Sequence, residues 1–147
     1  SAKDMYDRAT LMFPAVDAGI LCAAVADFTP ETTADEKIKR KGDDMVIRLK
    51  PTQDIAASLG QMKTEAQILV GFALETNDEK NNAQLKLKKK NLDFIVLNSL
   101  NDEGAGFRCD TNKITIISVD DEKDFPLKSK AEVAKDIVDE LENHIKA

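Results

Sequence analysis

The sequence predicts an α/β fold with a mostly parallel sheet. Short apolar segments of strand length alternate along the chain with segments whose apolar residues recur at helical spacing. Several apolar segments are continuous, as expected for parallel strands that are covered on both faces. With 147 residues, the chain is long enough for one domain, residues 1–147, with a sizeable core. We therefore expect a three-layer α/β/α, Rossmann-like arrangement around a mostly parallel, mixed sheet.

Capping signals and apolar runs predict the first elements. Ser1 and Asp4 resemble a helix-capping pair and predict a helix that opens the chain. The run GILCAAVA, residues 19–26, predicts a buried parallel strand in which Cys22 is a packed residue. The alternating segment MVIRL, residues 45–49, predicts a more exposed strand.

The middle of the chain predicts a helix, a buried strand and a second helix. Thr52 is expected to cap the first of these helices, and Gly60 lies near its end. The apolar run ILVGFAL, residues 68–74, predicts the buried strand. The polar helix that follows places Ala83 and Leu87 on one side.

Two strands and a long helix complete the predicted fold. The runs LDFIVL, residues 92–97, and ITIISV, residues 114–119, are of strand length. Ser129 and Glu132 predict a capping box for the last helix. The residues expected on the inward face of that helix are Val133, Ile137, Leu141 and Ile145.

The composition excludes several classes of protein. A net charge of -6 and a pI near 4.9 argue against a protein that coats nucleic acid, since such proteins neutralise phosphates with Lys and Arg. No apolar run is long enough to cross a bilayer, so we expect a soluble, cytoplasmic protein without a membrane partner. Two cysteines and one histidine are too few for a disulfide scaffold or a His/Cys metal cluster. The GxGxxG fingerprint is absent, which leaves an unrelated Rossmann-type oxidoreductase as a minor alternative.

Candidate functional residues follow the ends of the predicted strands, where open α/β sheets bind ligands. Asp27 follows the first strand, and the cations Lys37, Lys39, Arg40 and Lys41 come ten or more residues later. In one interpretation, Asp27 contacts a ribose or a divalent ion while flexible lysines close over phosphate. In the alternative, Asp27 ends the strand and the cations form a solvated loop.

Two further groups of residues can likewise be interpreted either as ligand contacts or as ordinary structural residues. Thr52, Gln53 and Asp54 lie at an expected helix N-terminus, whose free N–H groups can receive a phosphate or the polar edge of a base. Phe72 could pack on a base, while Lys86 and Lys90, four residues apart, could present two ammonium groups to an anion. Taken singly, these residues are equally well explained as a helix cap, a core aromatic and a solvated helix face.

Several blocks, in order along almost the whole chain, give a more specific indication. The segments AAVADFTP with EKIKRK, PTQDI, VGFALET, KKKNLDFIVLN and GAGFRCDTNKITII resemble bacterial phosphopantothenoylcysteine synthetase, the C-terminal half of bifunctional coenzyme A biosynthesis flavoproteins. The resemblance implies a ligase that joins 4'-phosphopantothenate to L-cysteine. In that family CTP and Mg²⁺ convert the carboxylate to an acyl-cytidylate, and the amine of cysteine then displaces CMP.

The resemblance also implies roles for individual residues. Lys37, Lys39 and Arg40 belong to the family's mobile lysine motif, which serves acyl transfer, and Arg40 stands where the family usually has lysine. The resemblance does not imply which residues bind the metal ion. The residues implied around CTP are Leu21, Cys22, Ala23, Asp27, Lys37, Gln53, Asp54, Ile55, Ala56, Phe72, Lys86 and Lys90.

The family's domain normally begins with a Gly-rich segment and an NxSSG segment that have no counterpart in this sequence. We therefore expect a C-terminal fragment that associates with a separate N-terminal segment, with a second copy as a homodimer, or with both. FMN is expected only if a decarboxylase domain is fused upstream. The alternative to a ligase is a nucleotide-binding or assembly module without catalysis.

Overall fold

The computed structural model describes residues 1–39, 42, 44–75, 77–99 and 109–146. A five-stranded sheet lies between helices on both of its faces, which confirms the predicted three-layer α/β/α fold with a mixed sheet. The elements in chain order are α1 (Ala2–Met12), a short 3-10 helix η1 (Phe13–Ala15), β1 (Ala18–Leu21), β2 (Phe28–Pro30), β3 (Leu49–Pro51), α2 (Ile55–Met62), β4 (Ile68–Glu75), α3 (Glu79–Lys89), β5 (Phe94–Ser99), β6 (Thr111–Asn112), β7 (Ile114–Ser118), β8 (Glu122–Asp124), β9 (Lys128–Ser129) and α4 (Lys130–Lys146).

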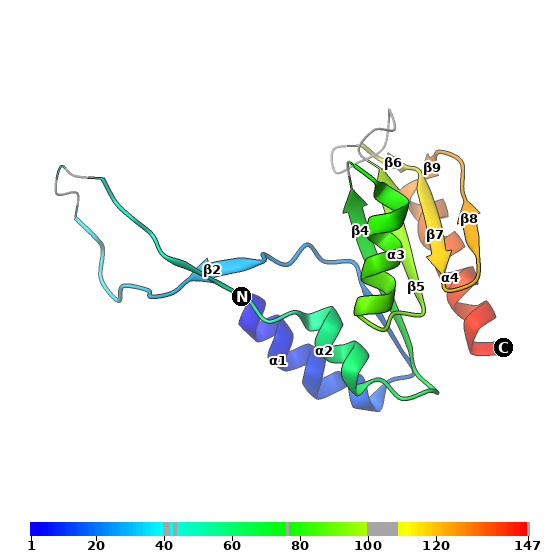
Figure 1. Ribbon diagram of the computed structural model, residues 1–147, viewed down its shortest axis with the longest axis horizontal. Coiled ribbons are helices and arrows are strands. Elements are labelled where there is room, and N and C mark those ends of the chain that lie inside the picture. Colours follow the sequence, from blue (N-terminus) through cyan, green and yellow to red (C-terminus); the bar gives the residue numbers. More distant parts are fainter. Residues whose placement is uncertain (40–41, 43, 76, 100–108, 147) are drawn as a thin grey trace.

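The parallel strands of the sheet are neighbours. The strand order is β1-β4-β5-β7-β8, and β4 pairs in parallel with both β1 and β5. The other two strands are antiparallel, because β7 runs against β5 and β8 runs against β7. The carboxyl ends of β1, β4 and β5 therefore share one edge, as the sequence predicted. Figure 1 shows α3 in front of this sheet and α4 behind it.

Successive residues of β4 enter two separate cores, because strand side chains alternate between the two faces. On one face, Leu69 belongs to the core that includes Leu59 of α2 and Leu87 of α3. On the other face, Val70 belongs to the core that includes Val133 of α4. Coverage on both faces explains the continuous apolar run of this strand. None of the helices in the described residues combines the length and the apolar character that crossing a membrane requires.

Both capping boxes predicted from the sequence are confirmed. At the start of α1, the Ser1 hydroxyl accepts a hydrogen bond from the N–H of Asp4, and the Asp4 carboxylate accepts one from the terminal ammonium group. At the start of α4, the Ser129 hydroxyl accepts a hydrogen bond from the N–H of Glu132, whose carboxylate accepts one from the N–H of Ser129. Local sequence therefore fixes where these two helices begin.

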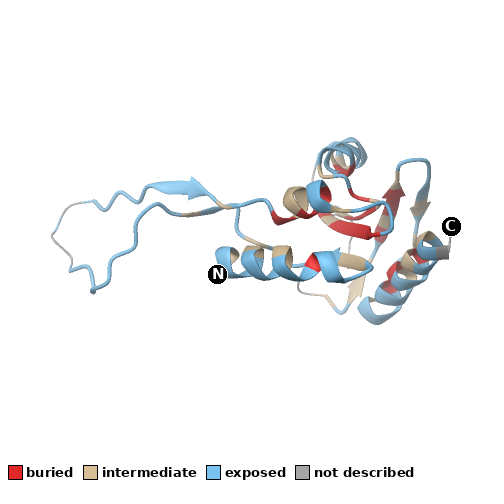
Figure 2. Cartoon of the chain, turned by 90° about the horizontal axis from the view of Figure 1, so that it is seen from below, coloured by how far each residue is buried: buried red, intermediate tan, exposed pale blue. Residues whose placement is uncertain are grey.

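The described residues between 28 and 51 form an arm that leaves the sheet. Within the described chain, β2 and β3 pair only with each other. The arm extends away from the helices and the sheet (Figures 1 and 2). Its apolar side chains are exposed, at 60% for Phe28 and 85% for Val46. The arm, which carries Lys37 and Lys39, therefore has no core of its own.

Two predicted strands need correction. β1 ends at Leu21, and residues 22–27 form an irregular loop in which Cys22 is exposed rather than packed. Among the described residues, β1 is an edge strand that pairs with β4 alone, and this pairing stops at Leu21 opposite Gly71, so residues 22–27 are not held by a sheet neighbour on either side. The strand predicted over residues 45–49 is wrong for most of its length, because β3 begins only at Leu49.

Two helix predictions are also wrong in detail. The cap of α2 is Asp54 rather than Thr52, because the Asp54 carboxylate accepts the hydrogen bond from the N–H of Ala57. Ile145 is 59% exposed rather than buried, since the core residues that α4 contributes end at Leu141.

Gly60 allows α2 to pack closely against the end of α3. A Cβ atom at Gly60 would lie 1.9 Å from the carbonyl oxygen of Lys90. The side-chain amide of Asn91 donates a hydrogen bond to the Gly60 carbonyl at 2.8 Å, and the left-handed backbone of Asn91 (φ 51°) follows the end of α3. Gly60 lies near the end of α2, as predicted, and its lack of a side chain serves the contact between the two helices.

Replacing Gly60 by alanine is expected to lower the free energy of unfolding by about 1–3 kcal/mol, because the new methyl group overfills the contact with α3. Urea denaturation of Gly60→Ala measures this loss. Gly71→Ala is the matched control: its Cβ would meet the movable Cδ1 of Leu92 at 2.6 Å, so a smaller loss is expected. Equal losses in the two variants would contradict the assigned role of Gly60.

Candidate functional site

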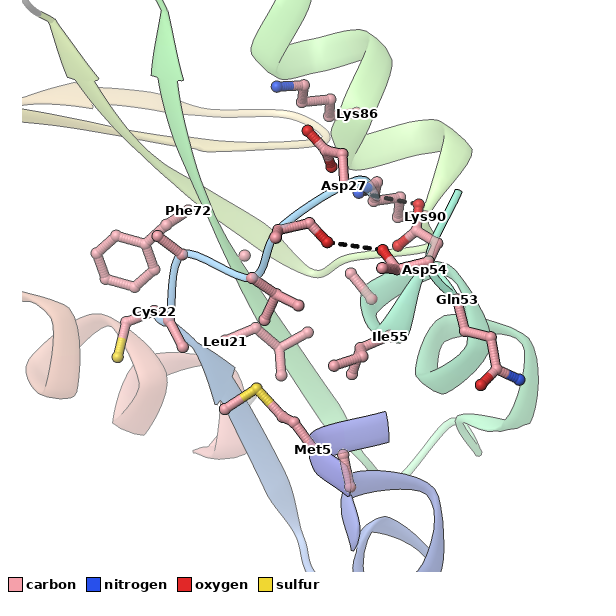
Figure 3. Close-up of a pocket in the computed structure, with 18 of the residues that line it drawn as sticks. Met5, Leu21, Cys22, Asp27, Gln53, Asp54, Ile55, Phe72, Lys86 and Lys90 are labelled. Atoms are coloured by element: carbon pink, nitrogen blue, oxygen red, sulfur yellow. Dashed lines mark hydrogen bonds and ion pairs between the residues drawn. The ribbon is translucent and has the colours of Figure 1, made fainter. Parts of the chain in front are cut away.

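A cavity of about 900 Å³ opens at the carboxyl ends of β1 and β4. Its walls come from α1, the end of β1, residues 22–28, residues 51–56, β4 and α3. Apolar side chains, among them Met5 and Leu21, lie on the opposite side from Lys86 and Lys90 (Figure 3). A cavity of this size, with a few polar groups on a largely apolar wall, is typical of a small-molecule site.

Thr52 joins the two ends of the arm beside this cavity. Its Oγ1 donates a hydrogen bond to the carbonyl oxygen of Ala26 at 2.7 Å. Its backbone N–H donates a second one to the carbonyl oxygen of Asp27 at 2.8 Å. Thr52 therefore holds the loop 22–27 against the start of α2, a role that differs from the helix cap predicted from the sequence.

Asp54 connects α2 with α3. Its Oδ1 accepts the capping hydrogen bond from Ala57 at 3.0 Å, and its Oδ2 lies 3.1 Å from the Nζ of Lys90. Partial burial acts to raise the pKa of the Asp54 carboxyl, but these two interactions outweigh burial and hold the pKa below its usual value of 3.8. Asp54 is therefore ionised at neutral pH.

Lys86 and Lys90 lie one helical turn apart at the end of α3, and both line the cavity. Each ammonium group already has a carboxylate partner. Lys90 pairs with Asp54, and the Nζ of Lys86 lies 2.5 Å from Oε1 of Glu75 at the end of β4. The charged side chains that line the described cavity are Asp27, Asp54, Lys86 and Lys90, so its formal charge is zero. A polyanionic ligand therefore needs further positive charge from elsewhere.

The structure gathers most of the predicted nucleotide-site residues in this one cavity. Lys37 and Lys39 lie on the arm and are not among the lining residues, and Arg40 falls outside the described residues. The predicted residues that line the cavity are Leu21, Cys22, Ala23, Asp27, Gln53, Asp54, Ile55, Ala56, Phe72, Lys86 and Lys90. Their placement is a finding, whereas their roles toward a ligand stay predictions.

The sequence did not predict the partners of two residues that organise this site. Thr52 lies in the segment PTQDI, but nothing in the sequence indicates that it bonds a loop 26 residues earlier. Glu75 lies in the segment GFALET, and no helical spacing connects it with Lys86. The Glu75–Lys86 pair joins the end of a strand to a helix, so only the tertiary structure brings the two residues together.

A divalent ion would find few protein ligands at this site. Within the described residues there is no group of three or more His, Cys, Asp or Glu side chains that could hold a metal ion. Asp54 is engaged by Ala57 and Lys90, which leaves Asp27 as the other carboxylate on the described cavity wall. Mg²⁺ is commonly held by one or two carboxylates together with substrate phosphates. The described donors therefore fit a metal ion that arrives with a phosphorylated ligand.

Comparisons with known proteins match almost the whole chain. Residues 1–145 match the family model of the DNA/pantothenate metabolism flavoprotein C-terminal domain. The coenzyme A biosynthesis bifunctional protein CoaBC of Bacillus subtilis (strain 168) is 46% identical over 142 residues, which are 96% of this chain and 35% of that protein. A protein named cysteine/cysteine sulfinic acid decarboxylase, from an unknown prokaryotic organism, is 60% identical over 139 residues, which are 94% of this chain and 39% of that protein. The chain thus spans little more than a third of the length of these curated relatives.

Solved structures agree with the fold. A crystal structure of the C-terminal domain of CoaBC matches with a TM-score of 0.79 and 33% identity, over 99% of this chain and 63% of that chain. The DNA/pantothenate metabolism flavoprotein from Streptococcus pneumoniae matches with a TM-score of 0.76 and 18% identity, over 97% of this chain and 69% of that chain.

Asp54→Ala is expected to lower the free energy of unfolding by about 0.5–2 kcal/mol at pH 7, because α2 loses its cap. Since the pKa of Asp54 is lowered in the folded state, this stabilisation is present above the unfolded-state pKa and is lost as the pH falls through the folded-state pKa. The difference between wild type and variant should therefore narrow as the pH falls below about 4 in urea denaturation series. Asp44→Ala, on the exposed arm, is the control. A difference that stays constant at acidic pH would contradict this account.

Proposed function

The chain belongs to the DNA/pantothenate metabolism flavoprotein C-terminal domain family, and on this premise we propose that it carries the phosphopantothenate–cysteine ligase function of coenzyme A biosynthesis. In the proposed reaction, CTP activates the carboxylate of 4'-phosphopantothenate, and L-cysteine is then joined to it. We propose that the reaction takes place in the cytoplasm and requires Mg²⁺.

One observation carries the proposal. The residues that the family resemblance implies around CTP come from four separate parts of the chain, and the fold brings eleven of them together around a single cavity. The cavity lies at the carboxyl ends of parallel strands, where α/β folds bind nucleotides. It also combines apolar wall area, suited to a base, with two lysines that suit phosphates.

The charge balance of the cavity supports a role for the arm and for Mg²⁺. The described wall is formally neutral, whereas a nucleoside triphosphate carries several negative charges. We propose that Lys37 and Lys39 of the arm, with Arg40 beside them, close over the phosphates and supply the missing positive charge. Lys37 lies ten residues beyond Asp27, a stretch that spans up to roughly 33–36 Å when extended, so the arm is long enough to return to the cavity.

The proposed chemistry consists of two displacements. A carboxylate oxygen of 4'-phosphopantothenate attacks the α-phosphorus of CTP, and the bond to pyrophosphate breaks. The amine of cysteine then attacks the acyl carbon of the resulting acyl-cytidylate, CMP leaves, and the amine proton is released. Negative charge builds up on the phosphoryl oxygens in the first step, so Lys86, Lys90 and Lys37 would lower its barrier by electrostatic stabilisation.

We further propose that two copies of this chain associate through the arm. An isolated two-stranded ribbon is marginally stable in water, and the arm exposes Phe28, Met45, Val46, Ile47 and Leu49. Exposed apolar residues concentrated on one segment indicate an interaction surface. A second copy offers the same surface and could pair with it symmetrically.

Binding of CTP with Mg²⁺, measured by isothermal titration, tests the site. Lys86→Ala and Lys37→Ala are each expected to weaken binding about tenfold or more, because each removes a charge-assisted contact to phosphate. The matched controls are Lys80→Ala, on α3 but outside the described cavity wall, and Lys50→Ala on the arm. Micromolar binding that tolerates Lys37→Ala would argue against the proposed role of the arm.

Release of pyrophosphate from CTP and 4'-phosphopantothenate distinguishes a ligase from a module that only binds nucleotide. Release by this chain that depends on Lys37 supports the ligase. Binding of CTP without release supports the module. Release of CO₂ from cysteine sulfinic acid would instead favour the activity for which one relative is named.

Light scattering tests the proposed dimer. A mass of about twice 16.2 kDa is expected, and Val46→Asp is expected to shift the protein toward the monomer, because it places a charge in the apolar contact. Val119→Asp, which alters a similarly exposed valine outside the arm, should leave the mass unchanged. A monomer at every concentration would contradict the proposed assembly.

A further inference from the structure

Glu75 is a charged residue beside the cavity that the proposed reaction does not use. It is the last residue of β4, its side chain is only 14% exposed, and it is not among the residues that line the described cavity. Its Oε1 accepts a hydrogen bond at 2.5 Å from the Nζ of Lys86, which does line the cavity. The carboxylate therefore holds this ammonium group from outside the space that a ligand would occupy.

Lys90 is held in a different way. Its partner Asp54 lines the cavity itself, and the Asp54 side chain is 49% exposed. A phosphate that approaches Lys90 therefore competes with Asp54 for the same ammonium group. A phosphate that approaches Lys86 meets a different arrangement, because Glu75, the carboxylate that pairs with this ammonium group, lies outside the described wall. Asp27 lies on that wall, but among the described residues no ion pair joins it to Lys86. The two neighbouring lysines thus differ in how freely they can receive an anion.

We propose that Glu75 is a positioning residue, which fixes the ammonium group of Lys86 at the cavity wall and so prepares it for a phosphate group of the ligand. This inference rests on the proposed function, since it takes the anion to belong to a nucleotide. A lysine side chain loses considerable rotamer freedom when it binds. The ion pair with Glu75 removes part of that freedom beforehand, so less is lost on binding.

The negative charge of Glu75 has the opposite effect, because it repels an incoming anion. The direction in which Glu75→Ala changes anion affinity therefore shows whether positioning of Lys86 or repulsion of the anion is the larger effect. If positioning exceeds repulsion, Glu75→Ala weakens anion binding, and it does so only while Lys86 is present. In a Lys86→Ala background the positioning effect disappears, and Glu75→Ala should leave the affinity unchanged or slightly raised.

The experiment is a double-mutant cycle of Glu75→Ala and Lys86→Ala, read by titration with CTP and, separately, with inorganic tripolyphosphate, each with Mg²⁺. Glu75→Ala is expected to weaken the binding of both ligands about three- to fivefold. Glu75→Gln, which keeps the shape and an acceptor oxygen, should weaken binding less and guards against misfolding of the alanine variant. Glu122→Ala is the matched control, because Glu122 pairs with Lys80 on the same helix but outside the cavity wall. It should change neither affinity.

A second readout follows Lys86 directly, without a ligand. Nuclear spin relaxation of the Lys86 side-chain nitrogen should show greater mobility in Glu75→Ala than in wild type and no change in Glu122→Ala. Unchanged mobility, tighter anion binding, or an equal loss of affinity in the Lys86→Ala background would each overturn the positioning role. If CTP binds no better than tripolyphosphate, the nucleotide function fails, while the dependence of tripolyphosphate binding on Glu75 and Lys86 still decides this inference.

Discussion

The parallel pairing of β4 with β1 on one side and with β5 on the other is the constraint on which the candidate site depends. Hydrogen bonds hold these three strands in one register, so their carboxyl ends stay at a common edge. The chain must then cross the sheet twice, through α2 before β4 and through α3 after it. These crossings bring the N-terminus of α2 and the lysines of α3 to the loop that follows β1. The cavity is thus a consequence of strand direction before any side chain is considered.

The ion pairs on the cavity wall make this cavity less attractive to anions than a wall of unpaired lysines would be. Each ammonium group on the described wall is opposed by a carboxylate, so anions in general are attracted only weakly. Strong binding would require charge that a ligand brings with it or recruits, such as a metal ion on its phosphates or the lysines of the arm. The metal ion and the lysines of the arm would then provide both the affinity and the selectivity, because they assemble only around the correct ligand.

The fold could be predicted from the sequence wherever elements are buried on both faces. Residues 68–74 of β4 and residues 94–97 of β5 are all apolar, and residues such as Leu69 and Phe94 are fully enclosed, which gives an unambiguous pattern. The run GILCAAVA was misleading because only its first part belongs to a strand. The small apolar residues Cys22 and Ala23 line the cavity instead of a core, and composition alone does not separate these two environments. The ion-pair partners of Lys86 and Lys90 could not be predicted from the sequence either, since both pairs join residues on different elements.

The two hydrogen bonds of Thr52 to Ala26 and Asp27 have a consequence for how this fold tolerates variation. These hydrogen bonds close the chain at the base of the arm, a point that we call the neck. The domain lies on one side of the neck, and the arm lies on the other. The entropic cost of closing a loop such as the arm grows only slowly with the length of the loop, by about 0.6 kcal/mol for each doubling. Insertions and deletions beyond the neck should therefore cost the domain little. Evolution can then remodel the reach of the arm while the geometry of the cavity is inherited unchanged.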